Sequence, residues 1–284
     1  MQAIINVPIC PVQGAPEATN LVDEVLFGMA VEVTGPAKDG WVPMRTHYRY
    51  EGYVPESALV TDPALVEQWQ ASSRRIVRHR HFADVLAEPR VQGAFVAKGL
   101  PLGARLAVTG PADENGWQPV RLPDGRTGFV CESFLDTLWE TPCAQGAELR
   151  RALTDAARFF AGTQYRWGGK TPQGVDCSGL CSMSYMLCGI NIYRDASIEP
   201  GFPIHRIHLS EMREGDLLYF PGHIAMYLGD GEYIHSTGHK GDNGVTINSL
   251  YPESPIYRKD LPNEIVAIGS YFGEEWNPEE EKAE

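Results

Sequence analysis

Apolar and polar positions alternate along the first half of the chain in two copies of one unit. The copies run over Gly28–Leu59 and Gly103–Leu135, and the sequence Val-Thr-Gly-Pro-Ala begins at Val33 in the first copy and at Val108 in the second. Gly-Pro, Asp-Gly and Asn-Gly pairs divide the copies into short segments with the period of two that is typical of half-buried strands. The pattern predicts two small antiparallel β barrels.

The two copies are joined by a stretch of helical character. Pro63–Arg75 contains no glycine, and its single proline stands at the start, where a helix tolerates it. We expect the matching residues Trp41 and Trp117 to pack within the barrels rather than to bind a ligand. The predicted organisation is a β domain over residues 1–62, a linker helix over 63–75 and a second β domain over 76–138.

After Leu135 the period changes to that of a helix. Apolar residues recur at helical spacing between residues 147 and 161, which predicts an amphipathic helix that ends at Gly162. A second helix is expected from Cys177 to Cys188. Strands are predicted after the helices, over residues 216–220, 223–228 and 232–235. Residues 139–284 are therefore predicted to form an α+β domain whose helices precede its sheet.

Composition and charge narrow the possible partners. The chain of 284 residues is long enough for two or three domains, and its 24 Lys and Arg against 37 Asp and Glu give a formal net charge of −13. We do not expect so acidic a chain to bind nucleic acid as its main partner. No apolar run approaches the roughly 18 residues that cross a bilayer, so we expect no membrane partner either.

The start of the chain and its cysteines predict the compartment. MQAIINVPICP lacks a basic segment followed by an apolar core, and the 6 cysteines follow no spacing typical of secreted disulfide scaffolds. We therefore expect a cytoplasmic protein, or an exported one if a leader has been removed. We also expect a monomer.

One cysteine stands where a thiol nucleophile is commonly activated. The residues around it, Gly174-Val175-Asp176-Cys177-Ser178, place Cys177 at the start of the second predicted helix, with Asp176 as the cap. A free thiol with a pKa of about 8.5 is mostly protonated at neutral pH. A helix dipole, free backbone N–H groups and a nearby imidazolium all favour the thiolate. We therefore expect the pKa of Cys177 to be lowered.

Two histidines are placed to serve that thiol. His223 begins one predicted strand and His235 ends the next, with a Gly-Asp-Gly hairpin between them. Residues on opposite strands of a hairpin face each other, so His223 is the candidate base and His235 the group that orients its ring. No CxxC or HExxH spacing is present, and Cys177-x-x-x-Cys181 is not a usual zinc spacing. We expect no metal and no other cofactor.

These residues belong to a longer series of motifs. In chain order the motifs are Tyr165-Arg166-Trp167-Gly168-Gly169, Asp176-Cys177-Ser178-Gly179-Leu180, Arg194-Asp195, Gly215-Asp216-Leu217, His223-Ile224-Ala225-Met226-Tyr227 and His235. The series spans most of residues 149–272 and resembles the NlpC family of bacterial cell-wall peptidases. The resemblance implies that Cys177 is the nucleophile, His223 the base and His235 the orienter. It also implies that the Tyr165 hydroxyl lies near the oxyanion or the substrate.

The repeated β unit, in turn, resembles bacterial SH3-like domains. The fold class implied is two small all-β SH3-like barrels followed by an α+β papain-like cysteine peptidase domain. Family members with this organisation are similar to γ-D-glutamyl-L-diamino acid endopeptidases, which cut peptidoglycan stem peptides that carry a free N-terminal L-alanine. The resemblance therefore implies a murein peptide substrate and a role in murein peptide recycling.

Further substrate contacts are implied by the same resemblance. Asp176 would bind the substrate ammonium, with Ser178 as a second contact, and an acid and a tyrosine of the first SH3-like domain would close one end of the cleft. The remaining substrate-binding candidates are Glu24, Tyr50, Tyr53 and Trp167. The family commonly has glutamine a few residues after Arg-Asp, whereas this chain has Glu199, whose role stays open.

Other interpretations stay open beside these. Asp176 is equally well explained as a helix cap alone. Tyr165, Trp167 and Tyr227 are all possible core residues, Trp167 above all. The alternatives to a peptidase are a non-catalytic protein that binds cell wall through its SH3-like pair, and a thiol amidase or acyltransferase with another substrate.

Overall fold

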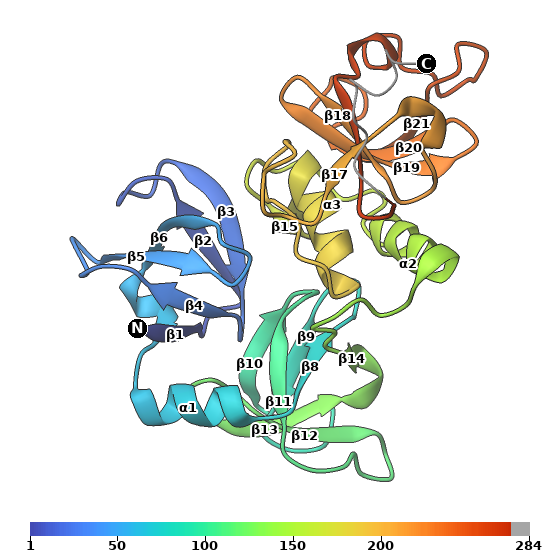
Figure 1. Cartoon of the computed structure of the whole chain (residues 1–284). Helices are drawn as coiled ribbons and strands as arrows, with labels where there is room; N and C mark the ends of the chain where they lie inside the picture. Colours follow the sequence, from blue (N-terminus) through green and yellow to red (C-terminus); the bar gives the residue numbers. More distant parts are fainter. Residues whose placement is uncertain (274–284) are drawn as a thin grey trace. The chain divides into compact units, whose positions relative to one another are not determined.

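The computed structural model describes residues 1–273, which form two compact units that are mostly β (Figure 1). The first unit comprises Met1–Leu138 together with Trp167–Gln173. The second unit comprises Trp139–Arg166 and the chain from Gly174 onward. Residues 274–284, the end of the predicted third domain, lie outside the described part. Within residues 1–273, no helix has the length and apolar character needed to span a membrane.

The first unit contains two seven-stranded antiparallel sheets with equivalent strand orders. The orders are β3-β2-β6-β5-β4-β1-β7 and β10-β9-β13-β12-β11-β8-β14, so the sequence repeat is also a repeat of topology. The first sheet, here called the first β domain, consists of β1 (Gln2–Ile5), β2 (Ile9–Gln13), β3 (Leu21–Leu26), β4 (Ala30–Val33), β5 (Trp41–Thr46), β6 (Glu51–Pro55) and β7 (Leu59–Val60). The second β domain consists of β8 (Arg74–Val77), β9 (Ala83–Leu86), β10 (Phe95–Leu100), β11 (Arg105–Val108), β12 (Trp117–Arg121), β13 (Thr127–Cys131) and β14 (Leu135–Thr137).

Alternation along the strands builds the core of each β domain. Successive side chains of a strand point to opposite faces, so every second residue is directed inward. In the second β domain the buried residues include Val77, Val85, Leu106, Val120 and Val130. The repeated residues Trp41 and Trp117, predicted to lie in the cores, are only half-buried at the starts of β5 and β12.

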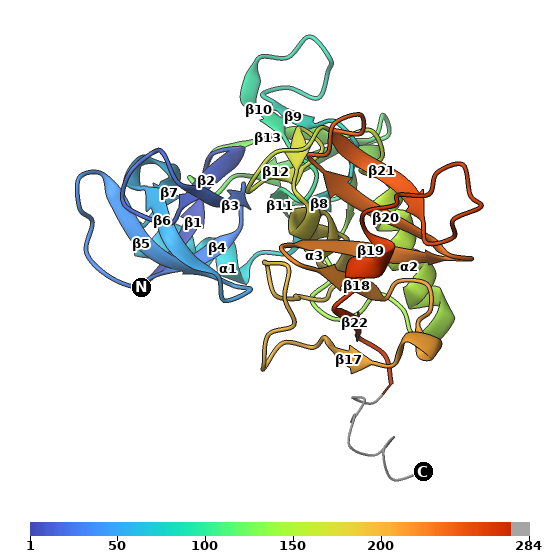
Figure 2. The same cartoon turned by 90° about the horizontal axis from the view of Figure 1, so that it is seen from above.

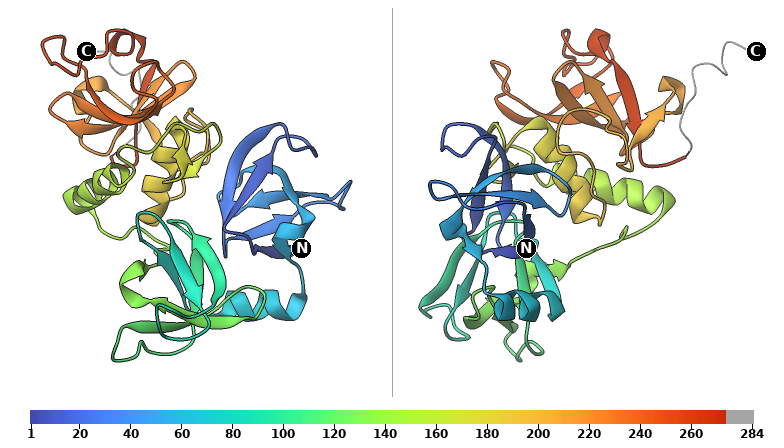
Figure 3. Two further views of the ribbon diagram at one scale, coloured as in Figure 1. Left: turned by 180° about the vertical axis from the view of Figure 1, so that it is seen from behind. Right: turned by 60° about the vertical axis from the view of Figure 1, so that its left-hand side comes forward.

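A short helix leads from the first β domain to the second (Figure 3). Helix α1 (Pro63–Ala71) begins at Asp62, whose side chain accepts hydrogen bonds from the next free backbone N–H groups. It ends four residues before the predicted boundary at Arg75 because β8 already begins at Arg74. Trp69 of α1 is buried, and its Nε1 donates a hydrogen bond of 3.1 Å to the carbonyl of Gly28. The helix is therefore packed against the first β domain.

The second unit has its helices before its sheet, as predicted. Its elements are α2 (Gly146–Arg158), β16 (Gly174–Val175), α3 (Cys177–Leu187), β17 (His205–Ile207), β18 (Leu217–Phe220), β19 (His223–Gly229), β20 (Glu232–Thr237), β21 (Gly244–Ser249) and β22 (Ala267–Ser270). The sheet order is β17-β22-β18-β19-β20-β21. Helix α3 packs against β19 and β20, and α2 packs against α3 and β19 (Figure 2). Strand β15 (Lys170–Thr171) and four short 3-10 helices, at Glu56–Ala58, Glu132–Phe134, Leu209–Glu211 and Pro262–Glu264, complete the elements of residues 1–273.

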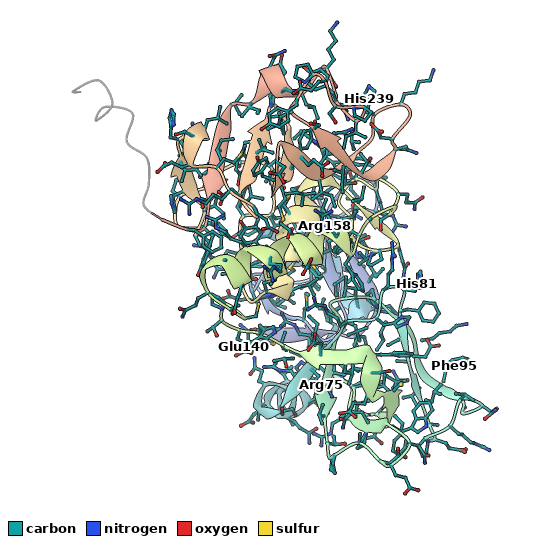
Figure 4. The ribbon with its side chains drawn as sticks, turned by 90° about the vertical axis from the view of Figure 1, so that its right-hand side faces the viewer. Arg75, His81, Phe95, Glu140, Arg158 and His239 are labelled. Carbon is teal, nitrogen blue, oxygen red and sulfur yellow. The ribbon has the colours of Figure 1, made fainter. Side chains whose placement is uncertain are left out.

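The two helices differ in how deeply they are buried. Helix α2 is amphipathic, as predicted, and ends at Arg158, labelled in Figure 4, four residues before Gly162. In α3 every residue from Cys177 to Leu187 is buried. A helix buried on all sides has a fixed position, so the residue at its first turn is held in place by the packing of the whole domain.

Candidate active site

The proposed nucleophile lies at the first residue of the buried helix. Cys177 is 8% exposed, and Asp176 caps the helix by accepting a hydrogen bond of 2.6 Å from the backbone N–H of Gly179. Backbone N–H groups of Ser178 and Ile224 donate to the sulfur. Since Ile224 follows His223 on β19, the thiol faces the start of the strand that carries the proposed base.

The two proposed histidines are in direct contact. His223 begins β19 and His235 lies on β20, and Nε2 of His223 is 2.7 Å from Nδ1 of His235. The predicted hairpin therefore does bring base and orienter together. On the next strand, β21, Oδ1 of Asn248 lies 2.8 Å from Nε2 of His235. Sequence reasoning missed Asn248, because only the register of β20 against β21 reveals it.

The orientation of Asn248 fixes where the protons of both rings lie. Its Nδ2 donates to the carbonyl of Ile256 at 3.0 Å, so its Oδ1 must be the atom that faces His235. Nε2 of His235 therefore carries a proton, and its Nδ1 accepts a hydrogen bond from the protonated Nε2 of His223. Nδ1 of His223 is then the unprotonated nitrogen, which is the state that a general base requires.

The prediction of a lowered thiol pKa was wrong. Burial, and next the negative charge of Asp176, raise the pKa of Cys177 to about 11, against the opposing effect of the N–H groups of Ile224 and Ser178. Burial, followed by the proximity of His235, lowers the pKa of His223 to about 3. Burial also lowers the pKa of His235 to about 4. The resting site therefore holds a neutral thiol and neutral imidazoles.

Asp176 is held by an arginine that is itself buried. Arg194 is 1% exposed, and its Nη1 and Nη2 lie 3.0 and 3.1 Å from the two carboxylate oxygens of Asp176. Nη1 also donates to the hydroxyl of Ser178 at 2.7 Å. The cap role of Asp176 is thus confirmed, and its charge is balanced within the protein. The sequence placed Arg194 in a motif without indicating its partner.

Tyr165 lies close to the thiol. It forms an isolated bridge with Val175, two residues before Cys177. Burial, and then the nearby Cys177 and Asp176, raise the pKa of Tyr165 to about 12. The phenol therefore stays protonated and available as a hydrogen-bond donor at neutral pH.

The remaining substrate-binding candidates belong to the first unit. Glu24 on β3 is buried, and its Oε2 accepts a hydrogen bond of 3.1 Å from the backbone N–H of Lys170. Tyr50 and Tyr53 are half-buried. The hydroxyl of another tyrosine, Tyr48, donates a hydrogen bond of 3.5 Å to the backbone carbonyl of Glu24. No pattern in the sequence singled out Tyr48.

Trp167 and Glu199 are both exposed. Trp167 is 68% exposed, so its interpretation as a core residue was wrong. Tyr227 is half-buried, and its hydroxyl accepts a hydrogen bond from the backbone N–H of Gly231. His239, labelled in Figure 4, lies in the loop after β20, outside the histidine pair. Among the described residues, no group of three His, Cys, Asp or Glu side chains is arranged to hold a metal ion.

A thiol at the first turn of a buried helix, faced by a hairpin whose two strands carry a pair of hydrogen-bonded histidines, is typical of the class of cysteine hydrolases. The NlpC/P60 family model matches residues 162–260, which include these groups. Dipeptidyl-peptidase 6 of Lysinibacillus sphaericus is 38% identical over 274 residues, 96% of this chain and 100% of that protein. The chain belongs to the NlpC/P60 family of cysteine peptidases.

Two further comparisons extend this result. The gamma-D-glutamyl-L-lysine dipeptidyl-peptidase of Bacillus cereus is 36% identical over 242 residues, which cover 77% of this chain and 68% of that protein. A crystal structure of an NlpC/P60 family protein from Bacillus cereus matches 96% of this chain and 100% of its own, with a TM-score of 0.76 at 21% identity. The second comparison shows a shared fold across both units.

Proposed function

We propose that this protein is a cysteine endopeptidase that cleaves the γ-D-glutamyl-L-diamino acid bond of stem peptides with a free N-terminal L-alanine. The observation that carries the proposal is the chain of contacts from Asn248 through His235 to His223, which leaves the unprotonated nitrogen of His223 available to Cys177. The name of one relative supports the choice of this bond as the one cleaved: a gamma-D-glutamyl-L-lysine dipeptidyl-peptidase aligns with 77% of this chain. The β domains are SH3-like and the catalytic domain papain-like in this proposal.

The mechanism follows from the neutral resting state. Nδ1 of His223 takes the thiol proton as the sulfur attacks the carbonyl carbon of the γ-D-glutamyl group, and His235 stabilises the imidazolium that forms. The phenol of Tyr165 donates to the oxyanion. His223 then returns the proton to the departing amine of the diamino acid. Water, deprotonated by His223, hydrolyses the thioester and releases the dipeptide.

Recognition of the free amino terminus is assigned to acidic and aromatic groups. We assign the ammonium to Asp176, which Arg194 holds in place, with Ser178 as a second contact. Glu24 is proposed separately as a substrate contact. Tyr50, Tyr53 and the exposed Trp167 are assigned to the substrate as well. A protein that requires a free amino terminus acts on released fragments, which fits murein peptide recycling in the cytoplasm.

The test is direct hydrolysis. Incubation with L-Ala-γ-D-Glu-L-Lys or its diaminopimelate counterpart should release L-Ala-γ-D-Glu and the free diamino acid. Cys177→Ala should abolish the reaction, and N-acetylation of the alanine should prevent it. Release of a different product would favour the amidase or acyltransferase alternative, and absence of any product from the folded wild-type protein would overturn the proposal.

A second candidate function, binding to cell wall, is favoured by one surface. A groove of the second β domain is lined by aromatic and polar side chains, and Phe82, Val91 and Phe95 around it are 48%, 75% and 59% exposed. Phe95, labelled in Figure 4, begins β10. If this surface carries the function, Cys177→Ala will co-sediment with purified sacculi, and Phe95→Ser will weaken that binding.

A further inference from the structure

A seven-residue loop between Tyr165 and Cys177 in the sequence belongs to the first unit, although both of its ends belong to the second. Trp167–Gln173 groups with the first unit, whereas Arg166 and Gly174 group with the second. The ends of the loop are tied to each other. The backbone N–H of Arg166 donates to the carbonyl of Val175 at 3.2 Å, and the N–H of Val175 donates to the carbonyl of Gln164 at 3.1 Å. The loop is therefore closed at its base.

The middle of this loop is fixed by a fully buried lysine. The side chains of Lys170 and Asp23 are both 0% exposed, and Nζ of Lys170 lies 2.9 and 3.0 Å from the two oxygens of Asp23. Nζ also donates to the hydroxyl of Tyr48 at 2.7 Å and lies 4.2 Å from the centre of that ring. The hydroxyl of Tyr48 donates to Asp23 in turn. The ammonium, the carboxylate and the hydroxyl therefore satisfy one another.

A buried ion pair adds little net stability to the loop it holds. Desolvation of the two charges offsets most of their attraction, and apolar residues of similar volume often stabilise a protein at least as well. What such a pair adds is position, since an ammonium has one favourable place relative to two carboxylate oxygens and a hydroxyl. The backbone N–H of the same Lys170 also holds the carboxylate of Glu24.

We propose that Lys170 is a positioning residue for the reaction: its ion pair with Asp23 fixes the loop whose two ends lead to Tyr165 and to Asp176–Cys177. The inference rests on the proposed function, because the groups it positions are those assigned to the substrate. At one end Tyr165 lies two residues before the loop, and at the other Cys177 lies four residues after it. A shift of the loop is transmitted to both ends, because the hydrogen bonds at its base tie them together.

The first test replaces the ammonium and keeps the chain length. Lys170→Met should accelerate amide hydrogen exchange in a peptide that spans residues 164–176, and should raise KM for the tripeptide roughly ten-fold, because small displacements of positioned groups are costly to reactivity. Tyr48→Phe, which removes the hydroxyl that Lys170 and Asp23 share but keeps the ring and the ion pair, should cause a smaller change in the same direction. Lys38→Met, an exposed lysine of the first β domain, should match the wild type in both measurements.

A double variant separates positioning from stability. Lys170→Met with Asp23→Leu removes both charges, and the hydroxyl of Tyr48 still has the carbonyl of Glu24 as an acceptor. We expect thermal stability to recover toward that of the wild type while KM stays raised. The proposal would be overturned if both KM and thermal stability of the double variant returned to wild-type values. It would also be overturned if Lys170→Met left amide hydrogen exchange over residues 164–176 unchanged. The exchange measurement needs no turnover, so a wild-type protein that fails to cleave the tripeptide would refute the proposed function alone.

Discussion

The rings of His223 and His235 meet edge to face, with their centroids 5.0 Å apart and one hydrogen bond of 2.7 Å between them. The base is therefore oriented by a second imidazole, which has two possible tautomers. Only the tautomer with the proton on Nε2 of His235 leaves Nδ1 free to accept from His223. Asn248 selects that tautomer, so the competence of the base depends on a residue one strand further away.

Asn248→Ala should therefore lower activity without removing any group of the triad. Loss of the Oδ1 acceptor lets His235 place its proton on either nitrogen, and in one of these states it cannot accept from His223. We expect kcat/KM to fall roughly 10- to 100-fold, the usual effect of removing an outer hydrogen-bond partner. Steady-state kinetics measures this, with Asn263→Ala as the control because Asn263 is exposed. A loss of less than two-fold would show that Asn248 does not control the tautomer.

Activity should persist to lower pH than in an enzyme whose base is a histidine of ordinary pKa. Protonated His223 cannot take the thiol proton, and burial lowers the pKa of His223 to about 3. The acid limb of kcat/KM should therefore lie well below the ordinary histidine value of about 6.5. Initial rates, measured only at pH values where the protein stays folded, locate this limb. An acid limb between pH 6 and 7 would contradict the neutral resting site.

The free energy of unfolding, unlike activity, should decline as pH falls. The folded-state pKa values of His223 and His235 are lowered to about 3 and about 4, so below about pH 6.5 the unfolded chain binds more protons than the folded one. Each histidine should cost roughly 2 kcal/mol of unfolding free energy between pH 7 and pH 5. Urea unfolding of the wild type and of His235→Gln at both pH values tests this. The variant should lose less stability on acidification, and equal losses would contradict the prediction.

Sequence reasoning recovered features that depend on local pattern and missed those that depend on tertiary contacts. The repeat predicted two equivalent sheets, and the Gly-Asp-Gly hairpin predicted the contact of His223 with His235. The pKa of Cys177 was predicted with the wrong sign because a helix start favours a thiolate locally, whereas burial of all of α3 opposes it. The partner of Lys170 lies 147 positions away along the chain, and no local pattern indicates it.

Arg194 offers a test of how the site tolerates its buried charge. Arg194→Met removes the group that balances Asp176, and leaves a buried carboxylate that still accepts hydrogen bonds from Gly179 and Ser178. Removing one partner of a buried pair costs about 3–5 kcal/mol. Thermal and urea unfolding should show this loss, whereas Arg206→Met, at an exposed position of β17, should leave stability unchanged.

The matching double variant shows whether the stability lost in Arg194→Met is due to the unpaired charge or to altered packing. Asp176→Asn combined with Arg194→Met removes the unpaired charge and keeps an acceptor for the N–H of Gly179, so most of the lost stability should return. Activity should not return with it, because the substrate contacts proposed for Asp176 would be lost. If the single variant Arg194→Met unfolds with the wild-type free energy, the carboxylate of Asp176 must be solvated in the protein, and the burial that raises the pKa of Cys177 would then be in question.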